Sequence, residues 1–127
     1  MAYNILIVDD SKLARMAVAK ALRGRHGDWA RLEAANADEA IALTKQTHID
    51  VALLDFNMPG RDGLALAAEL RELYPNLPVG LVSANHQVEI VNGAREVGAI
   101  FMTKPMTEAV LNDFMAMAIT QISAAVR

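Results

Sequence analysis

Short apolar runs alternate with longer segments of helical periodicity along this chain. The clearest run, Val51 to Leu54, leads directly into Asp55, and Pro59 and Gly60 then break the backbone. A run this short, apolar on both faces and bounded by a turn, is typical of a buried strand in a parallel sheet. Similar runs, weakest at the second, predict four more strands, at residues 5–8, 31–35, 78–82 and 99–102.

The segments between these runs predict helices. Ser11, Asn36 and Asp62 stand where the first three would begin, and such residues commonly cap helix N-termini. The expected helices cover about 12–24, 37–48, 63–74, 86–97 and 107 onward. In the first of them, Leu13, Met16, Ala17 and Ala21 lie near helical spacing. The last has the strongest apolar stripe, formed by Leu111, Phe114, Met115, Ala118, Ile119 and Ile122.

Two glycines stand inside expected elements. Gly80 within the fourth strand suggests that a neighbouring group packs closely against the backbone there. Gly93 within the fourth helix weakens that helix by roughly 1 kcal/mol relative to alanine.

Five strand–helix pairs predict an α/β fold: a doubly wound, five-stranded parallel sheet with helices on both faces. The strand order 2-1-3-4-5, common in such folds, puts the switch point between the first and third strands. Asp9 and Asp10 follow the first strand and Asp55 ends the third, so all three carboxylates should meet at one crevice. Ser83 and Lys104, after the fourth and fifth strands, reach the same edge.

Composition narrows the class of protein. The chain of 127 residues suits one domain, and with 54% hydrophobic and 21% charged residues it is a globular sequence. The net charge of −3 gives no basic excess that would suggest nucleic-acid binding, and the absence of cysteine excludes disulfides and zinc–thiolate sites. No signal peptide or membrane-spanning run is evident, so we expect a soluble, cytoplasmic domain.

Three crowded carboxylates repel one another and favour a divalent cation, and oxygen ligands without histidine or cysteine suit Mg²⁺. A carboxylate can also act as a covalent nucleophile that forms an aspartyl-phosphate. Lys104 could then neutralise a phosphoryl group, and the Ser83 hydroxyl could bond one of its oxygens. Each residue alone could be an ordinary cap or surface charge; their convergence at four strand ends favours a site.

These motifs together resemble the receiver domain of bacterial response regulators, above all its stand-alone, chemotaxis-type members. The resemblance covers nearly all of residues 1–127 and implies a flavodoxin-like (βα)5 fold. It is carried by the following segments: Val8-Asp9-Asp10-Ser11, Leu54-Asp55-Phe56-Asn57-Met58-Pro59-Gly60 with Asp62-Gly63, Ser83-Ala84 and Lys104-Pro105.

The resemblance implies roles at the site. Asp55 would be the phosphoacceptor, and Asp10 would ligate Mg²⁺ directly, Asp9 mainly through water and Asn57 through its main-chain carbonyl. Ser83 would be the switch hydroxyl, where threonine is commoner, and Phe101 the aromatic switch residue, without the hydroxyl of a tyrosine. Asn57 and Asn85 would set how fast the phosphate is lost, and Lys104-Pro105 would be a cis peptide.

The implied function is a phosphorylation-dependent signalling switch, not an enzyme acting on other substrates. A histidine kinase or phosphotransfer protein would phosphorylate Asp55. The face formed by the fourth helix, fifth strand and fifth helix would then bind a downstream protein or a second copy of the chain. Phe101 could instead be an ordinary core residue and Asn85 a plain loop residue. No direct contact with nucleic acid or membrane is expected.

Three alternatives remain at this stage. A phosphohydrolase with an aspartate nucleophile would normally carry a second acid two residues beyond Asp55, where Asn57 stands. A flavin-binding electron carrier would need a phosphate-cradling first loop, and Asp9 and Asp10 would repel that phosphate. The chain could also be the receiver part of a larger regulator with a DNA-binding or catalytic output domain.

Overall fold

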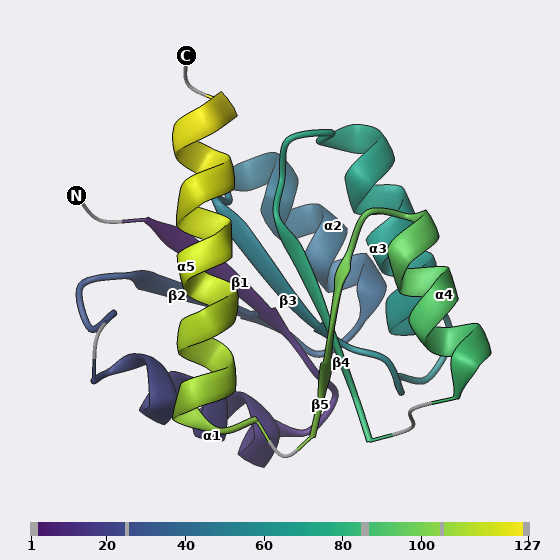
Figure 1. Ribbon diagram of the computed structural model, residues 1–127, viewed down its shortest axis with the longest axis horizontal. Helices are drawn as coiled ribbons and strands as arrows, with labels where there is room; N and C mark the ends of the chain where they lie inside the picture. The colour runs from purple at the N-terminus through teal and green to yellow at the C-terminus, as the bar shows by residue number, and fades with distance from the viewer. Residues whose placement is uncertain (1–2, 25, 85–86, 105, 126–127) are drawn as a thin grey trace.

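The computed structural model describes residues 3–24, 26–84, 87–104 and 106–125, without the side chain of Ala125. Within them strands and helices alternate along the chain (Figure 1). The strands are β1 (Asn4–Val8), β2 (Ala30–Ala34), β3 (Val51–Asp55), β4 (Val79–Ser83) and β5 (Ile100–Thr103). The helices are α1 (Lys12–Leu22), α2 (Ala37–Gln46), α3 (Gly63–Leu73), α4 (Val88–Glu96) and α5 (Glu108–Ala125).

All five strands form one parallel sheet in the order β2-β1-β3-β4-β5. This confirms the predicted fold class and strand order. Because β1 and β3 are neighbours and the chain leaves them toward opposite sides, their carboxyl ends form the switch point of the sheet. Those ends lie along the lower edge of the sheet in Figure 1.

Alternate residues of the strands feed two separate apolar cores. Ile5 and Ile7 point to the face that α1 and α5 cover, whereas Leu6 and Val8 point to the face under α2, α3 and α4. The first core includes Leu22, Leu111, Phe114 and Met115, and the second includes Ala40, Leu66, Leu70 and Ala94. Burial on both faces explains why β1, β3 and β4 have nearly continuous apolar sequences.

The predicted helix starts are confirmed by side-chain caps. Ser11, Asn36 and Asp62 accept hydrogen bonds from the backbone amides of Ala14, Glu39 and Ala65 at 3.2, 2.9 and 2.9 Å. Each bond satisfies one of the amides that a helix N-terminus leaves unpaired. The helix ends were less well predicted: α1 ends at Leu22 and α4 at Glu96.

Of the four apolar positions predicted on α1, only Ala21 is partly buried against the core. Leu13 and Met16 are 77% and 54% exposed, and Ala17 is exposed as well. The helix is rotated so that Ala14, Val18 and Leu22 face the sheet and α5. Two large apolar side chains are therefore presented to solvent on α1.

The two glycines inside elements mark close contacts. A Cβ atom on Gly80 would stand 2.4 Å from Met102 and 2.9 Å from Phe114, which confirms the predicted close packing at this position. A Cβ atom on Gly93 would stand 2.8 Å from Leu64. The helix-weakening glycine of α4 thus lets α4 approach α3. No helix in the described part of the chain is both long and apolar enough to cross a bilayer.

Candidate functional site

Three carboxylates converge at the carboxyl edge of the sheet, as the sequence predicts. Asp9 and Asp10 follow β1, Asp55 ends the neighbouring β3, and one oxygen from each lies within 4.8 Å of the others. Asp9 and Asp55 are buried, whereas Asp10 is exposed. The group therefore has two fixed oxygens at its base and one facing solvent.

Lys104, which follows β5, lies next to the acid cluster. Its ammonium nitrogen lies 2.7 Å from Oδ1 of Asp55, and its backbone amide donates to the carbonyl of Ser83 at 3.1 Å. Partial burial by itself lowers the pKa of Lys104. The hydrogen bond that Lys104 donates to Asp55 and the charges of Asp55, Asp9 and Asp10 outweigh this and raise that pKa. Lys104 therefore stays a cation at neutral pH.

Ser83 lies beside this ion pair. It is only 1% exposed and stands one residue beyond Val82, the register partner of Asp55. Its own partner across β5 is Thr103. The predicted hydroxyl therefore lies at the same strand ends as the acids and the lysine.

The carboxyl of Asp9 has a raised pKa in the folded protein. Burial raises its pKa above the ordinary 3.8, and the charges of Asp55 and Asp10 add to the rise. A hydrogen bond from the Ser11 amide at 2.9 Å and the charge of Lys104 oppose it only in part. The folded protein therefore holds a proton on Asp9 more tightly than the unfolded chain does.

We predict that Asp9→Asn stabilises the metal-free protein at neutral pH by roughly 0.5 to 2 kcal/mol. Asparagine keeps an oxygen for the Ser11 amide and removes the buried charge. A raised pKa in the folded state means that stability is lost as pH rises through that pKa and is fully present below the ordinary aspartate value. The advantage of the variant should therefore shrink on acidification.

Urea unfolding with chelator, at neutral pH and at about pH 4, measures this difference. Asp113→Asn on the exposed side of α5 is the control and should change little at either pH. A variant that is less stable than the wild type at neutral pH would show that Asp9 is not under electrostatic strain.

The loop after Asp55 closes on itself. The amide of Gly63 donates to the carbonyl of Phe56 at 2.9 Å, and Met58 within the loop is buried in the core. Gly60 has a φ of +79°, a conformation that glycine adopts without steric cost. A Cβ atom on Gly63 would stand 2.2 Å from the carbonyl oxygen of Asp55, so the start of α3 packs directly on the backbone of Asp55.

The structure describes two of the other predicted site residues, Asn57 and Phe101. Asn57 is exposed in the closed loop, and Phe101 is half-buried on the edge strand β5, packed against the core under α2, α3 and α4. Asn85 and Pro105 lie outside the described residues, so the expected tuning role of Asn85 and the expected cis peptide after Lys104 remain predictions.

The donor set fits a hard divalent cation. The three carboxylates supply only oxygen, and their charge of −3 against the single positive charge of Lys104 leaves an excess that one divalent ion balances. Mg²⁺ prefers such carboxylate oxygens and keeps several waters, for which exposed Asp10 leaves room.

Arg15 and Glu33 lie next to the site and were not predicted from the sequence to do so. Arg15 donates from Nη1 to the carbonyl of Asp9 at 2.5 Å and from Nε to Oε1 of Glu33 at 2.9 Å. A bond to a backbone carbonyl leaves no signature in the pattern of side chains, and a basic residue on a helix is usually a solvated one. The position of Arg15 one helical turn beyond Ser11 was the available signal.

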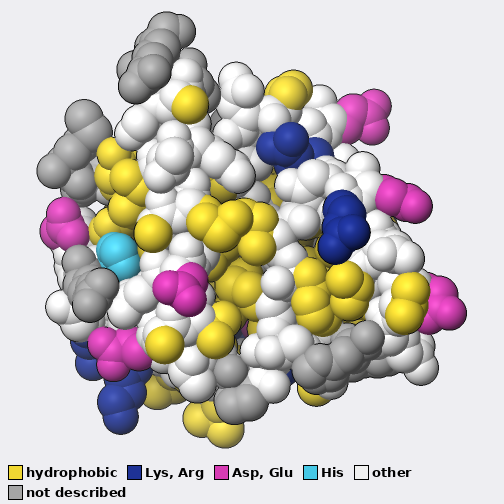
Figure 2. All heavy atoms as spheres, viewed as in Figure 1, with side chains coloured by type: hydrophobic (Ala, Val, Ile, Leu, Met, Phe, Trp, Pro, Cys, Tyr) yellow, Lys and Arg dark blue, Asp and Glu magenta, His cyan; other side chains and the backbone are white. Residues whose placement is uncertain are grey.

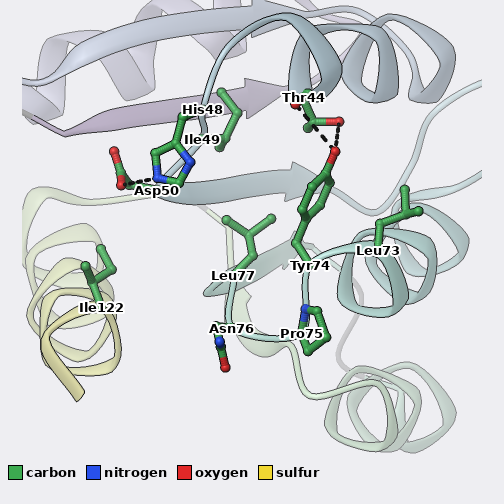
Figure 3. Close-up of a pocket in the computed structure, with 10 residues that line it drawn as sticks. All are labelled: Thr44, His48, Ile49, Asp50, Leu73, Tyr74, Pro75, Asn76, Leu77 and Ile122. Carbon is green, nitrogen blue, oxygen red and sulfur yellow. Dashed lines mark hydrogen bonds and ion pairs between the residues drawn. The ribbon is translucent and has the colours of Figure 1, made fainter. Parts of the chain in front are cut away.

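Two pockets lie at opposite ends of the sheet. A pocket of about 230 Å³ reaches from Asp9, Asp55 and Lys104 down between α1 and the sheet, with apolar walls that include Val18 and Met106. A larger one of about 420 Å³ lies at the amino ends of the strands, between Tyr74 and Ile122 (Figure 3). Polar groups of this larger pocket bond to one another, as in the Tyr74–Thr44 and His48–Asp50 pairs. The smaller pocket, which contains the acids and Lys104, is therefore the candidate reactive site.

Comparison with known proteins identifies this arrangement. The model of the response regulator receiver domain matches residues 5–116. The chain belongs to this family. The receiver domain is 38% identical over 113 residues to the glycerol metabolism activator of Pseudomonas putida, covering 87% of this chain and 51% of that protein.

Solved receiver structures agree. Chemotaxis protein CheY4 of Vibrio cholerae superposes with a TM-score of 0.84 at 25% identity, over 93% of this chain and 99% of that one. The CheX–CheY–BeF3–Mg²⁺ complex of Borrelia burgdorferi matches with a TM-score of 0.83 at 27% identity, over 92% of this chain and 89% of that one. The chain thus covers 99% and 89% of these two solved chains but spans only about a fifth to a half of the length of curated relatives.

Family membership sets the general function. Receiver domains act as signalling switches in two-component systems, bind Mg²⁺ through acidic residues, and interact with kinases and downstream partners. In this chain Asp9, Asp10 and Asp55 form an acidic cluster of the kind that could hold such an ion.

Proposed function

We propose that this chain is a phosphorylation-dependent switch that accepts a phosphoryl group on Asp55. The observation that carries the proposal is the cluster itself: a buried carboxylate at the end of β3, paired with Lys104 at 2.7 Å and flanked by two further acids. A lone buried aspartate with a lysine partner would be an ordinary ion pair. The extra acids make sense if the cluster binds a cation together with an anionic substrate.

In the proposed reaction a carboxylate oxygen of Asp55 attacks the phosphorus of a phosphohistidine on a kinase or phosphotransfer protein. The phosphorus–nitrogen bond breaks as the new phosphorus–oxygen bond forms, and the bonding pair returns to the imidazole, which takes up a proton. Asp55 becomes an aspartyl-phosphate. Lys104, kept cationic by the acids around it, pairs with the arriving phosphoryl oxygens.

Asp10 and Asp55 are the proposed direct ligands of Mg²⁺, with the main-chain carbonyl of Asn57, and Asp9 acts mainly through water. The exposure of Asp10 and the Ser11 amide already bonded to Asp9 support this division. When bound, the ion offsets the negative charge of phosphate and acceptor as they approach. The carboxylates hold that ion beside the reacting oxygen.

The phosphoryl donor is proposed to dock over α1. This helix begins directly after Asp10 and Ser11, and its Leu13 and Met16 are exposed large apolar side chains. Large apolar side chains exposed beside a reactive site favour contact with another protein. Their position next to the acids would bring the donor's phosphohistidine to Asp55.

The switch is proposed to run from Ser83 to Phe101. Phosphoryl oxygens would draw the Ser83 hydroxyl inward, and Phe101, two residues before Thr103, could then pack into the vacated space. The face of α4, β5 and α5 would change its shape as a two-state population shift. Figure 2 shows apolar side chains gathered along β5 between α5 and α4. Ile100, Phe101 and Val91 are half-buried there, and Val88 and Met117 are exposed.

The partner of that face is proposed to be a downstream protein or a second copy of the chain. Because the chain spans about half or less of several curated relatives, an attached output domain is a second candidate for the readout. Asn57 and Asn85 are proposed to set the lifetime of the phosphate, since a carboxamide can hold an attacking water.

We predict that a beryllofluoride mimic of phosphorylation slows or speeds amide exchange across residues 87–120, beyond the acids themselves. The reason is that Ser83 and β5 connect the acceptor to α4 and α5. Hydrogen exchange with Mg²⁺, with and without beryllofluoride, measures it, and Asp55→Asn is the control that cannot form the adduct. Changes confined to the three acids and their loops would refute this output face.

A further inference from the structure

The side chain of Arg15, which is not part of the acid cluster, binds the backbone of one of its acids. The Arg15 guanidinium bridges two groups: Nη1 donates to the main-chain carbonyl of Asp9 at 2.5 Å, and Nε donates to Oε1 of Glu33 at 2.9 Å. The Arg15 side chain is only 15% exposed, which is low for a cation on a helix surface. Glu33 lies on β2, so the bridge joins α1, the β1–α1 turn and the edge strand.

The bonded carbonyl belongs to the peptide that links Asp9 to Asp10. The amide of Asp9 donates to the carbonyl of Ala34 at 3.1 Å, and the amide of Ser11 donates to Oδ1 of Asp9 at 2.9 Å. These two bonds fix the start of the turn and the Asp9 side chain. The peptide plane between the two acids is fixed by Arg15, and its rotation would turn the exposed Asp10 carboxylate away from Asp55.

We propose that Arg15, anchored by Glu33, is a positioning residue of the acid cluster. It holds the Asp9–Asp10 peptide so that both carboxylates face the proposed Mg²⁺ ion. This inference rests on the proposed Mg²⁺ site and adds to it a residue that touches neither metal nor phosphate. Outer contacts of this kind typically change metal affinity by roughly 10- to 100-fold when removed.

Charge alone predicts the opposite sign. Arg15 is a cation near three carboxylates, so its removal should make the crevice more negative and strengthen the binding of a divalent cation. Positioning predicts weaker binding. The direction of the change in Mg²⁺ affinity therefore separates the two roles. A residue that only stabilises the fold would leave this affinity unchanged while the protein remains folded.

Titration calorimetry with Mg²⁺ alone tests this on the wild type, Arg15→Met and Arg15→Lys. We expect roughly tenfold weaker binding for Arg15→Met. Arg15→Lys keeps the charge and one donor, and should restore part of the affinity. Lys12→Met is the matched control: it removes one positive charge from the same helix at an exposed position, and it should leave the affinity equal or slightly tighter.

Arg15→Met that binds Mg²⁺ as tightly as the wild type, or more tightly, would overturn the proposal. Circular dichroism of each variant establishes that it is folded at the temperature of the titration. If Arg15→Met fails to fold, Arg15→Lys decides, because it keeps the positive charge: weaker Mg²⁺ binding than in the wild type supports positioning by the guanidinium, and unchanged binding refutes it. A wild type that binds no Mg²⁺ would refute the proposed function itself, which is a separate outcome.

Discussion

Asp55→Asn is expected to abolish covalent phosphorylation of the protein by acetyl phosphate or by a phosphorylated histidine kinase. Asparagine keeps the size of the side chain at the end of β3 but lacks the carboxylate oxygen that would attack phosphorus. Intact-mass measurement after incubation with donor and Mg²⁺ reports the adduct directly.

Asp113→Asn, on the exposed side of α5, is the matched control and should be labelled as fully as the wild type. Full labelling of Asp55→Asn would remove Asp55 as the acceptor and leave the acid cluster without its proposed reaction.

Removal of Mg²⁺ by a chelator is expected to stop the same reaction, and the two aspartates after β1 should differ in how strongly they matter. Asp10→Ala should weaken Mg²⁺ binding by more than the roughly 10- to 100-fold typical of an outer partner, because Asp10 is proposed to ligate directly. Asp9→Ala should fall within that range, since Oδ1 of Asp9 already accepts the Ser11 amide.

Titration calorimetry of both variants against the wild type measures the difference. Equal losses would mean that the direct and the water-mediated roles have been assigned to the wrong residues. Unchanged binding in both would place the ion elsewhere.

The residues that end strands were predictable because neighbouring residues in the sequence indicate both where a strand is buried and where it ends. Val51 to Leu54 are buried on both faces and Asp55 follows at once, so the run and the acid together place the carboxylate at an edge of the sheet. The order of strands then brings Asp9 and Asp55 together without any further information. Ser83 and Lys104 follow by the same reasoning.

The orientation of α1 was not predictable in the same way. Its sequence has two apolar stripes about one residue apart, and two large side chains, Leu13 and Met16, lie on the stripe that stays exposed. Periodicity shows that a helix has an apolar side but not which neighbour covers it, and here α5 and the sheet accept the stripe of Ala14, Val18 and Leu22. Arg15 was missed for a related reason, because its partner is a backbone carbonyl.

The closed loop between Phe56 and Gly63 has a consequence for protein engineering. Its two ends are tied by their own hydrogen bond, and buried Met58 anchors its middle, while Asn57, Pro59 and Arg61 are exposed. The exposed side chains of the loop therefore do not determine where β3 ends or where α3 begins. Exchange of exposed Asn57 should therefore leave β3 and α3 in place, so that the proposed lifetime of a phosphate on Asp55 could be changed without altering the strand that carries the proposed acceptor.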